Sequence, residues 1–376
     1  MIEKKLSDYI DINPATKLEK GKCYPFVEME NIVVGIKRPI TENMLIFAGQ
    51  SCSKFKPNDT LMARITPCLE NGKVVKYSNG NAGFGSTEFI VFRGKSGLAD
   101  DDYVYYLAKS QYIRDMAINS MTGASGRQRA DAKFIGKIKW NFPSLNIQTK
   151  IASILSSYDD LIENNNKRIK ILEQMAENLY KEWFVRFRIP GYQTAEFENG
   201  IPKGWKVVRV KNCLKRLPFN RLCKQDELES SGKVIVIDQS SNEFMGFHNN
   251  EPSHYASFED PIILFGDHSC KFVLMTKNFS LGENVVPFRS INTEELDNYY
   301  LYYAVHKLIV TEEYKRHWGR FTAMKFFKPQ INLQKKFAEF VKQLVHKKEM
   351  LWIQNQNLIK QRDLLLPRLM SGKLEV

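Results

Sequence analysis

An internal repeat at close to half the chain length constrains the fold of this 376-residue chain more than any other feature. Four segments of the first half return in the second half, in the same order and at a nearly constant spacing. They are 87–93 in 283–289, 103–107 in 300–304, Gly126-Arg127 in Gly319-Arg320, and 145–152 in 331–338. Because four echoes in one order are hard to obtain by chance, we predict two copies of one structural unit.

Each copy begins with a globular part of mixed secondary structure. Short apolar and β-branched runs, such as 60–65 and 234–237, are separated by Gly and Asn turn signals and predict strands. Helices rich in tyrosine are expected near 102–120 and 297–314, where the tyrosines are more typical of a core than of base stacking. The fold class is therefore α+β.

A long helix is predicted to follow each globular part. Apolar residues recur at alternating intervals of four and three along 151–183 and again along 337–358, which is the coiled-coil period. About 35 residues at about 1.5 Å each exceed what one small domain covers. We expect the two helices to pack antiparallel as a spacer, with Asn165 and Lys348 fixing their register. The alternative is that each helix packs only on its own domain.

The expected organisation is a pseudo-two-fold repeat, with a Gly- and Pro-containing linker between the copies. In chain order the parts are a first globular domain at 1–144, a first long helix at 145–188, a linker at 189–204, a second globular domain at 205–330, a second long helix at 331–363 and a C-terminal tail at 364–376.

Composition indicates a polyanionic partner. Lys and Arg number 55 against 42 Asp and Glu, a net charge of +13 that suits nucleic acid or an acidic membrane surface. No apolar run approaches the roughly 18 residues that a membrane span needs, and no apolar region follows the N-terminus as in a signal peptide. The six cysteines show no metal-binding or disulfide spacing, so we expect a cytoplasmic protein with reduced thiols.

Catalytic signatures are missing from the sequence. Gly94-Lys95-Ser96 resembles the end of a phosphate loop, but Phe89 stands where such a loop needs glycine. No Gly-x-Gly-x-x-Gly, His-Glu-x-x-His or Gly-x-Ser-x-Gly motif occurs. The neighbouring carboxylates Asp159 and Asp160 are expected on a solvated helix face. We therefore predict a protein that is not an enzyme and has no cofactor and no metal site.

Basic and polar loops are the candidates for DNA contact. Arg can donate two parallel hydrogen bonds to guanine, Gln can do the same for adenine, and either can hold a phosphate. Solvated basic loops and ordinary turns are the alternative interpretation. The predicted DNA-binding residues are Arg64, Thr66, Lys73, Ser86, Thr87, Arg127, Gln128 and Arg129 in the first copy, and His268, Lys271, Arg316 and Arg320 in the second.

Several stretches together resemble the specificity subunits of type I restriction–modification enzymes, and the resemblance covers nearly the whole chain. The stretches are 61–73 (LMARITPCLENGK), 83–89 (GFGSTEF), 181–188 (KEWFVRFR) and 366–374 (LPRLMSGKL). In the second copy, 265–268 (FGDH) departs from the motif that the first copy carries at 64–67 (RITP).

The resemblance implies two target-recognition domains, each reading one half of a split, asymmetric site in double-stranded DNA. The paired helices would set the unread spacer and dock two modification (methyltransferase) subunits, which restriction subunits with ATP-driven translocation and nuclease activity would join. S-adenosylmethionine, ATP and magnesium would belong to those partners. We assign partner binding to Trp183, Phe184, Arg186 and Arg368, which lie in the matching stretches.

Two other functions remain open from the sequence. The chain could be a fragment of a single-chain methyltransferase or restriction enzyme, which would have to bind S-adenosylmethionine or cut DNA. It could also be a coiled-coil scaffold whose basic loops are incidental, in which case it would not show DNA binding that falls steeply with added salt.

Overall fold

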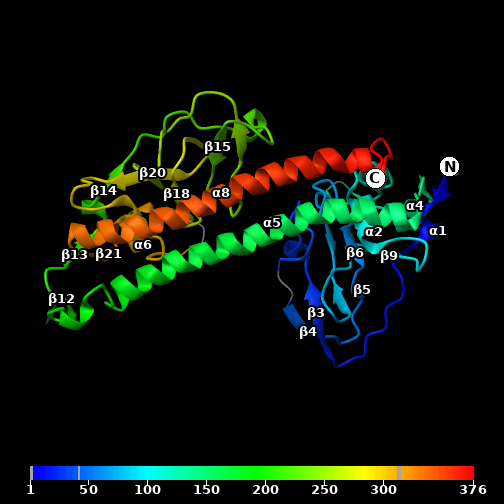
Figure 1. The fold of residues 1–376 in the computed structure, drawn as a ribbon, viewed down its shortest axis with the longest axis horizontal. Coiled ribbons are helices and arrows are strands. Elements are labelled where there is room, and N and C mark those ends of the chain that lie inside the picture. Colours follow the sequence, from blue (N-terminus) through cyan, green and yellow to red (C-terminus); the bar gives the residue numbers. More distant parts are fainter. Residues whose placement is uncertain (1–2, 41–42, 125, 311–314) are drawn as a thin grey trace. The chain divides into compact units, whose positions relative to one another are not determined.

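The chain folds into two compact units, each of mixed helix and sheet (Figure 1). The computed structural model describes residues 3–40, 43–124, 126–310 and 315–376. Unit 1 contains residues 1–167 together with the C-terminal 352–376, and unit 2 contains 168–351. Within the described ranges, no helix combines the length and apolar character that would let it cross a membrane.

Unit 1 is built on two four-stranded sheets. The first is antiparallel, and its central strand β6 is buried along its whole length because sheet and helices cover both of its faces. The second contains one parallel pair, β3 with β8. In sheet order the strands are β2 (Ile10–Ile12), β9 (Phe89–Gly94), β6 (Thr60–Ala63) and β7 (Val74–Lys76), and then β4 (Asn43–Ile46), β3 (Cys23–Val27), β8 (Gly83–Gly85) and β5 (Ser53–Phe55).

Short helices complete unit 1, and the Tyr-rich helix α2 forms much of its core. Asp100 caps α2, since its carboxylate accepts the backbone N–H groups of Asp102 at 3.0 Å and Tyr103 at 2.9 Å. The tyrosines of α2 are buried, which confirms that they are core residues. The elements are β1 (Lys4–Lys5), α1 (Leu6–Tyr9), α2 (Asp101–Lys109), α3 (Gln111–Asn119), α4 (Ala132–Lys137) and β10 (Lys139–Trp140), with β1 paired to β10.

Unit 2 repeats this strand order. In its four-stranded sheet, the strand that comes last in the chain lies second in the sheet, as β9 does in unit 1. Its second sheet contains one parallel pair, β15 with β19, as the second sheet of unit 1 does. The elements are β14 (Leu214–Arg216), β20 (Val285–Ser290), β17 (Ile262–Gly266) and β18 (Phe272–Met275), then β16 (Gly246–His248), β15 (Val234–Ile237) and β19 (Phe279–Leu281), with β13 (Lys206–Arg209) paired to β21 (Lys325–Lys328), and the helices α6 (Asn298–Val305) and α7 (Trp318–Ala323).

Two long helices, α5 (Leu145–Tyr180) and α8 (Ile331–Met370), each contribute to both units. In unit 1, Ile151 and Leu155 of α5 share a core with Leu366 and Leu369 of α8. Each helix therefore packs on a globular part, and the two helices also contact each other within each unit.

One buried glutamine anchors the start of each long helix to its own unit. The side chain of Gln148 accepts the N–H of Asp100 at 3.0 Å and donates to the carbonyls of Leu98 and Pro143. Gln334 makes the same three bonds with the backbones of Asp297, Glu295 and Pro329. Both glutamines are fully buried. The repeat of 145–152 in 331–338 thus corresponds to the place where each long helix is attached to its own unit.

The C-terminal ends of both long helices differ from the predicted ends at residues 188 and 363. The C-terminal helix continues through Met370, well into the predicted tail, because Leu366, Leu369 and Met370 are buried in the core of unit 1. The first helix ends in a π turn at Lys181–Val185, and Phe187 then adopts a positive φ of 57° that ends helical geometry before residue 188.

The prediction for Asp159 was wrong, because this carboxylate is 3% exposed and lies between the two long helices within unit 1. It accepts hydrogen bonds from the guanidinium of Arg362 on α8 and from the hydroxyl of Tyr106. Six residues further along α5, Asn165 donates to the amide oxygen of Asn355 at 2.9 Å. Two polar pairs are therefore buried where these helices meet.

Lys109, at the end of α2, is a buried cation that destabilises unit 1. Its ammonium nitrogen has no hydrogen-bond partner in the described part of the chain and lies 5.8 Å from the Tyr105 ring centroid. Desolvation, followed by the nearby positive charge of Arg362, lowers the pKa of Lys109 from 10.5 to about 8. Below that pH the folded chain bears the cost of a buried charge.

We expect Lys109→Met to raise the free energy of unfolding by about 1–3 kcal/mol at pH 7, because the apolar stem remains and the buried charge is removed. A depressed lysine pKa makes the unfolded state bind more protons between about pH 8 and the ordinary value of 10.5, so wild-type stability rises across that range. The gain should therefore shrink as the pH rises towards 10. Thermal unfolding from pH 7 to 10 tests this, with exposed Lys150→Met as control; a gain that does not change with pH would contradict it.

Candidate nucleic-acid interface

In unit 1, two segments far apart in sequence bring most of the predicted DNA-binding residues together. The backbone N–H of Ala130 donates to the carbonyl of Arg64 at 2.8 Å, and Thr66 N–H donates to Gln128 at 3.1 Å. The N–H of Gln128 in turn donates to the Thr66 hydroxyl at 3.2 Å. We call this group loop cluster 1, and its members are Arg64, Thr66, Thr87, Arg127, Gln128 and Arg129.

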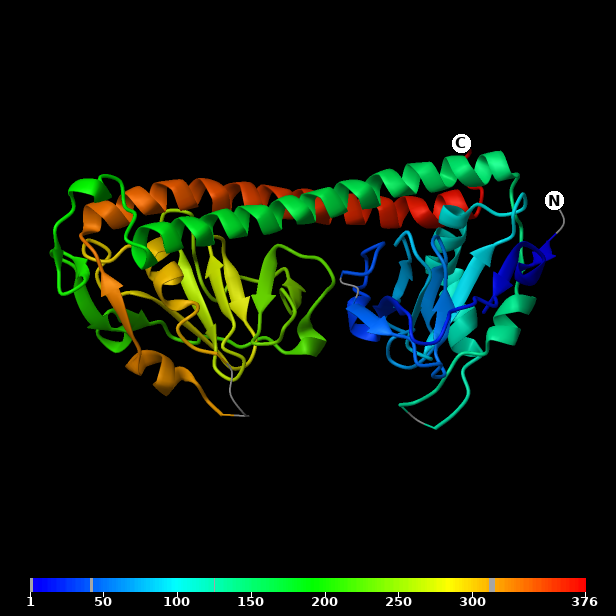
Figure 2. The same cartoon turned by 90° about the horizontal axis from the view of Figure 1, so that it is seen from below.

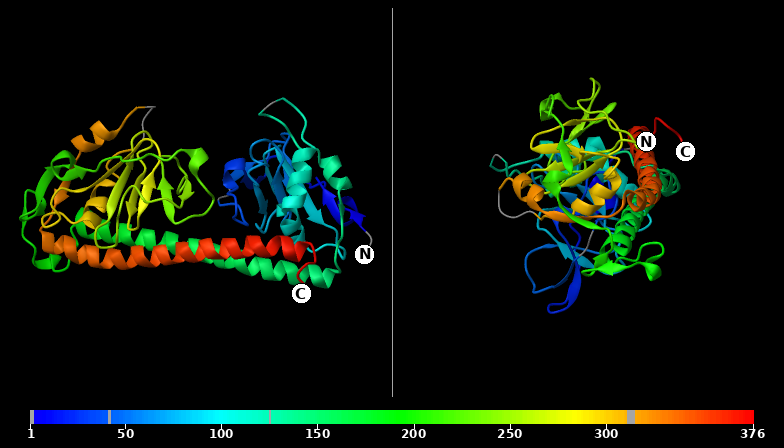
Figure 3. Two further views of the ribbon diagram at one scale, coloured as in Figure 1. Left: turned by 90° about the horizontal axis from the view of Figure 1, so that it is seen from above. Right: turned by 90° about the vertical axis from the view of Figure 1, so that its left-hand side faces the viewer.

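The loop that carries Arg127 leaves the body of unit 1 on the face away from α5 (Figures 2 and 3). Gly123 and Gly126 have φ values of 123° and 76°, in a region that side chains disfavour, so glycine is required for this turn. Arg127 is exposed at the turn. A guanidinium in that place is accessible to a DNA groove or to a phosphate.

Arg129, a predicted DNA-binding residue, is paired with the carboxylate of Glu88, and its contact with DNA stays a prediction. Its Nε lies 2.9 Å and its terminal nitrogen 2.7 Å from the two oxygens of Glu88. In this bidentate pair, two nitrogens of the guanidinium donate to the two carboxylate oxygens, which places a negative charge beside Arg129. Arg129 therefore joins the loop to the β8–β9 connection, and Arg127 is the more accessible of the two cations.

Arg64 lines an open pocket of about 440 Å³ on unit 1. Its Nε is buried and has no hydrogen-bond partner among the residues that the structure describes. Lys54, Thr16 and Thr87 also line this pocket. Two cations and two hydroxyl groups around one hollow provide the donors that a phosphate group requires.

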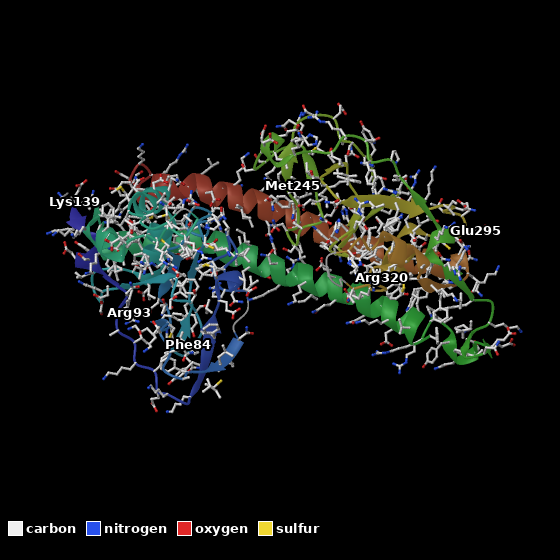
Figure 4. The ribbon with its side chains drawn as sticks, turned by 180° about the vertical axis from the view of Figure 1, so that it is seen from behind. Phe84, Arg93, Lys139, Met245, Glu295 and Arg320 are labelled. Carbon is white, nitrogen blue, oxygen red and sulfur yellow. The ribbon has the colours of Figure 1, made fainter. Side chains whose placement is uncertain are left out.

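Two other predicted contacts in unit 1 have structural partners. The ammonium group of Lys73 donates to the carbonyl of Met29 at 2.9 Å, and the Ser86 hydroxyl accepts the N–H of Glu88 at 3.2 Å. The glycines beside Phe84 (Figure 4) serve the sheet, because a Cβ on Gly85 would lie 2.3 Å from the carbonyl oxygen of Val27. Lys73 and Ser86 thus have structural contacts, and their contact with DNA stays a prediction.

In unit 2, Asp267 brings the corresponding loops together. It follows β17, as Arg64 follows β6, and its carboxylate accepts the N–H groups of His317 at 3.0 Å and Trp318 at 2.8 Å. Arg316 is exposed beside it, with Nε 3.9 Å from an Asp267 oxygen. His268 follows directly, and its N–H donates to the Gln239 side chain at 3.0 Å. An acidic capping residue thus occupies the place of Arg64.

Lys271 has structural partners and Arg320 lies outside the predicted loop, and DNA contact by either residue stays a prediction. The ammonium group of Lys271 donates to the carbonyls of Asp238 and Asn242, and desolvation lowers its pKa. Arg320 lies on α7 rather than in a loop (Figure 4), with a terminal nitrogen 3.3 Å from Nδ1 of His317. Gly126-Arg127 therefore lies in a loop and Gly319-Arg320 on a helix, so the two pairs are not structurally equivalent. Residues 311–314, at the end of the range 297–314 for which a helix was expected, lie outside the described residues.

Two of the four residues assigned to partner binding are core residues of unit 2. Trp183 and Phe184 are 8% and 1% exposed, and the Phe184 ring packs 4.7 Å from Tyr300 and 5.2 Å from Phe337. Their aromatic character reflects the packing of α5, so this assignment was wrong for their side chains. Arg186 and Arg368 are exposed, and Arg186 pairs with Glu182.

Neither Lys54 nor Thr16 could be identified as a site residue from the sequence. Each lies in a short segment without motif or charge run. Lys54 lies on β5 and Thr16 lies four residues after β2, and the fold of unit 1 brings both to the pocket. No group of three or more His, Cys, Asp or Glu side chains is arranged to hold a metal ion within the described ranges.

Comparisons with known proteins agree with this arrangement. Residues 3–174 match the family model described as "Type I restriction modification DNA specificity domain". The specificity subunit of the type I restriction enzyme MjaIX from Methanocaldococcus jannaschii is 28% identical over 323 residues, which are 75% of this chain and 71% of that relative. The chain is thus similar to type I restriction specificity subunits over three quarters of its length.

Further relatives carry the same name. The EcoEI specificity subunit of Escherichia coli is 30% identical over 131 residues, or 33% of this chain and 22% of that protein. The fold of the chain is similar to the crystal structure of a type I restriction-modification S subunit from M. genitalium. That match has a TM-score of 0.56 at 17% identity and covers 98% of this chain and 96% of the other. These relatives are named as specificity subunits of type I restriction enzymes.

Proposed function

We propose that this chain is a type I restriction specificity subunit that reads a split, asymmetric sequence in double-stranded DNA, with one half-site for each unit. The observation that carries the proposal is that the two units repeat one strand order and differ in the residues at the site. Arg64 follows β6 in unit 1, whereas Asp267 follows β17 at the equivalent place in unit 2. Different donors and acceptors select different base pairs, so the two half-sites differ.

The long helices serve as the spacer between the half-sites in this proposal. A helix of 36 residues is about 54 Å long. Contacts between α5 and α8 in both units support the pairing, through Asn165 with Asn355 in unit 1 and Glu173 with Lys348 at 3.2 Å in unit 2. The length of paired helix would then set the number of unread base pairs.

The same helices offer surfaces for the partner enzymes. Ile147, Ile154 and Leu161 recur at seven-residue intervals on α5 and are 37%, 37% and 49% exposed. Such a stripe on an otherwise polar helix is typical of a protein contact. We assign it to a modification (methyltransferase) subunit, with one such subunit per unit and restriction subunits joining that core. Exposed Arg186 and Arg368 remain candidate partner contacts.

The test is DNA binding and methylation by the subunit assembled with its methyltransferase. Arg127→Ala and Arg64→Ala should each weaken binding by about 5- to 100-fold, since each removes one base or phosphate contact worth about 1–3 kcal/mol. Loss of a phosphate contact also reduces the dependence of binding on salt. If Arg127 reads a base, sequencing of methylated sites should show relaxed specificity in one half-site only.

Lys139→Ala is the matched control, because Lys139 is an exposed cation of unit 1 on β10, outside loop cluster 1 (Figure 4). It should leave affinity and methylated sequence unchanged. Equal effects of Arg127→Ala, Arg64→Ala and Lys139→Ala would show that only net charge matters and would contradict the assigned site.

A further inference from the structure

We propose that two buried polar pairs between α5 and α8 make these helices selective for each other, so that the first copy of the repeat pairs with the second and rejects a second copy of itself. Such selectivity is needed because the repeat gives the chain two similar long helices. Two similar helices in one chain can pair with each other or with their like in another chain. This inference does not depend on what the protein binds.

The two helices can be compared position by position. Gln148 and Gln334 make the same three backbone bonds at the start of their helices, which defines a shift of 186 residues from α5 to α8. The apolar residues that follow keep this shift, since Ile151 and Leu155 correspond to Phe337 and Val341, and all four are buried.

Asp159 and Arg362 form the first selective pair. Both side chains are 1% exposed, and the guanidinium donates to the carboxylate within unit 1. The shift of 186 residues makes Val345 the counterpart of Asp159, and Ala176 the counterpart of Arg362. Val345 and Ala176 are both buried in the core of unit 2. These positions thus hold an ion pair in unit 1, whereas the equivalent positions in unit 2 hold apolar residues.

Asn165 and Asn355 form the second selective pair, with an amide hydrogen bond of 2.9 Å and exposures of 4% each. Their counterparts under the same shift are Leu351 and Ile169. Leu351 is buried and Ile169 is half-buried in unit 2. Again a matched polar pair in unit 1 corresponds to apolar residues in unit 2.

Pairing of like helices breaks both matches. If α5 paired antiparallel with a second α5, Asp159 would face Ala176 and Asn165 would face Ile169, twice in each dimer. If α8 paired with a second α8, Arg362 would face Val345 and Asn355 would face Leu351. A buried charge without a partner is strongly destabilising, and a buried polar residue in a helix seam selects its partner in the same manner. Only the unlike pair, α5 with α8, satisfies all four groups.

The selectivity concerns the identity of the helix and not of the chain. An α5 from one molecule and an α8 from another match as well as two from the same molecule, so the device does not prevent exchange of halves between molecules. What it excludes is an assembly with two first copies or two second copies.

The experiment begins with the full folded chain, in which a protease site replaces the exposed turn at Asn199-Gly200. Cleavage gives two fragments, and native mass spectrometry then records which dimers they form after reversible dissociation in mild denaturant. We expect unlike dimers of one first and one second fragment, with like dimers at least about 100-fold rarer. Like dimers in random proportion would overturn the proposal.

A double variant, Asp159→Val with Arg362→Ala, gives α5 and α8 the residues that unit 2 has at the same positions. It should raise the proportion of like dimers by at least tenfold, and addition of Asn165→Leu with Asn355→Ile should raise it further. Because unit 2 already packs these residues, the uncut variant should remain folded, which its thermal unfolding checks. A variant that still forms only unlike dimers would show that the polar pairs are not the determinant.

The matched control exchanges the charges, Asp159→Arg with Arg362→Asp. The unlike pair keeps one cation and one anion, and both like pairs remain mismatched, so the control should form unlike dimers as the wild type does. Like dimers from this variant would indicate that the original packing, and not charge matching, gives the selectivity.

Discussion

Replacement of Arg362 by Met should lower the free energy of unfolding by about 3–5 kcal/mol, because it leaves the Asp159 carboxylate buried without a cation. The guanidinium also donates to the carbonyl of Gly35 at 2.9 Å, so a loop of unit 1 loses a contact as well. Urea unfolding followed by hydrogen exchange within unit 1 measures the loss. The effect should appear in unit 1, which contains all of these groups.

A double-mutant cycle separates the pair from its surroundings. Removal of both charges, with Asp159→Val and Arg362→Met together, should recover most of the stability, because no buried charge then remains. Asp363→Asn is the control, since Asp363 also contacts Arg362 but is 51% exposed and should contribute under about 1 kcal/mol. Purely additive losses in the cycle would show that Asp159 and Arg362 do not act as a pair.

Gln148→Leu should destabilise unit 1 by about 3 kcal/mol, and Gln334→Leu should destabilise unit 2 by a similar amount. Each change removes the partner of one buried N–H and two carbonyls, at about 1 kcal/mol for each backbone group. Hydrogen exchange should show faster exchange at the start of α2 for the first variant and at the start of α6 for the second.

Two further variants sharpen this prediction. Gln148→Glu retains an acceptor for the N–H of Asp100 and loses both donors, so it should remain destabilising although its shape is unchanged. Gln174→Leu changes an exposed glutamine of α5 and should alter stability by less than about 0.5 kcal/mol. Equal effects of Gln148→Leu and Gln174→Leu would contradict the role of the buried amide.

The sequence predicted those parts of the fold that depend on local pattern. The echo of 145–152 in 331–338 marks the joint made by Gln148 and Gln334, and apolar periodicity identified the long helices because each buries a continuous stripe. The echo of Gly126-Arg127 in Gly319-Arg320 misled because two residues are too few to fix a register, and the structure places Arg320 on a helix.

What the sequence could not reveal depends on partners far along the chain. Asp159 resembles any helical carboxylate until Arg362 approaches it from the other long helix, 203 residues later. In the sequence, Arg129 and Lys73 resemble free cations. In the structure, Arg129 pairs with Glu88, and Lys73 donates a hydrogen bond to the backbone carbonyl of Met29. The predicted DNA-binding set was assembled from side-chain chemistry, and tertiary contacts decide which members remain accessible.

The composition of unit 1 has a consequence for how the protein is made. Its core includes Leu366, Leu369 and Met370 of α8, which are synthesised after all of unit 2. Domains made early in synthesis usually fold early, but unit 1 begins first and can complete its core only after unit 2 has been made. A product that stops before α8 would thus lack a finished unit 1 even though it contains all of residues 1–167. Unit 2 is therefore the first of the two units whose residues are all available for folding.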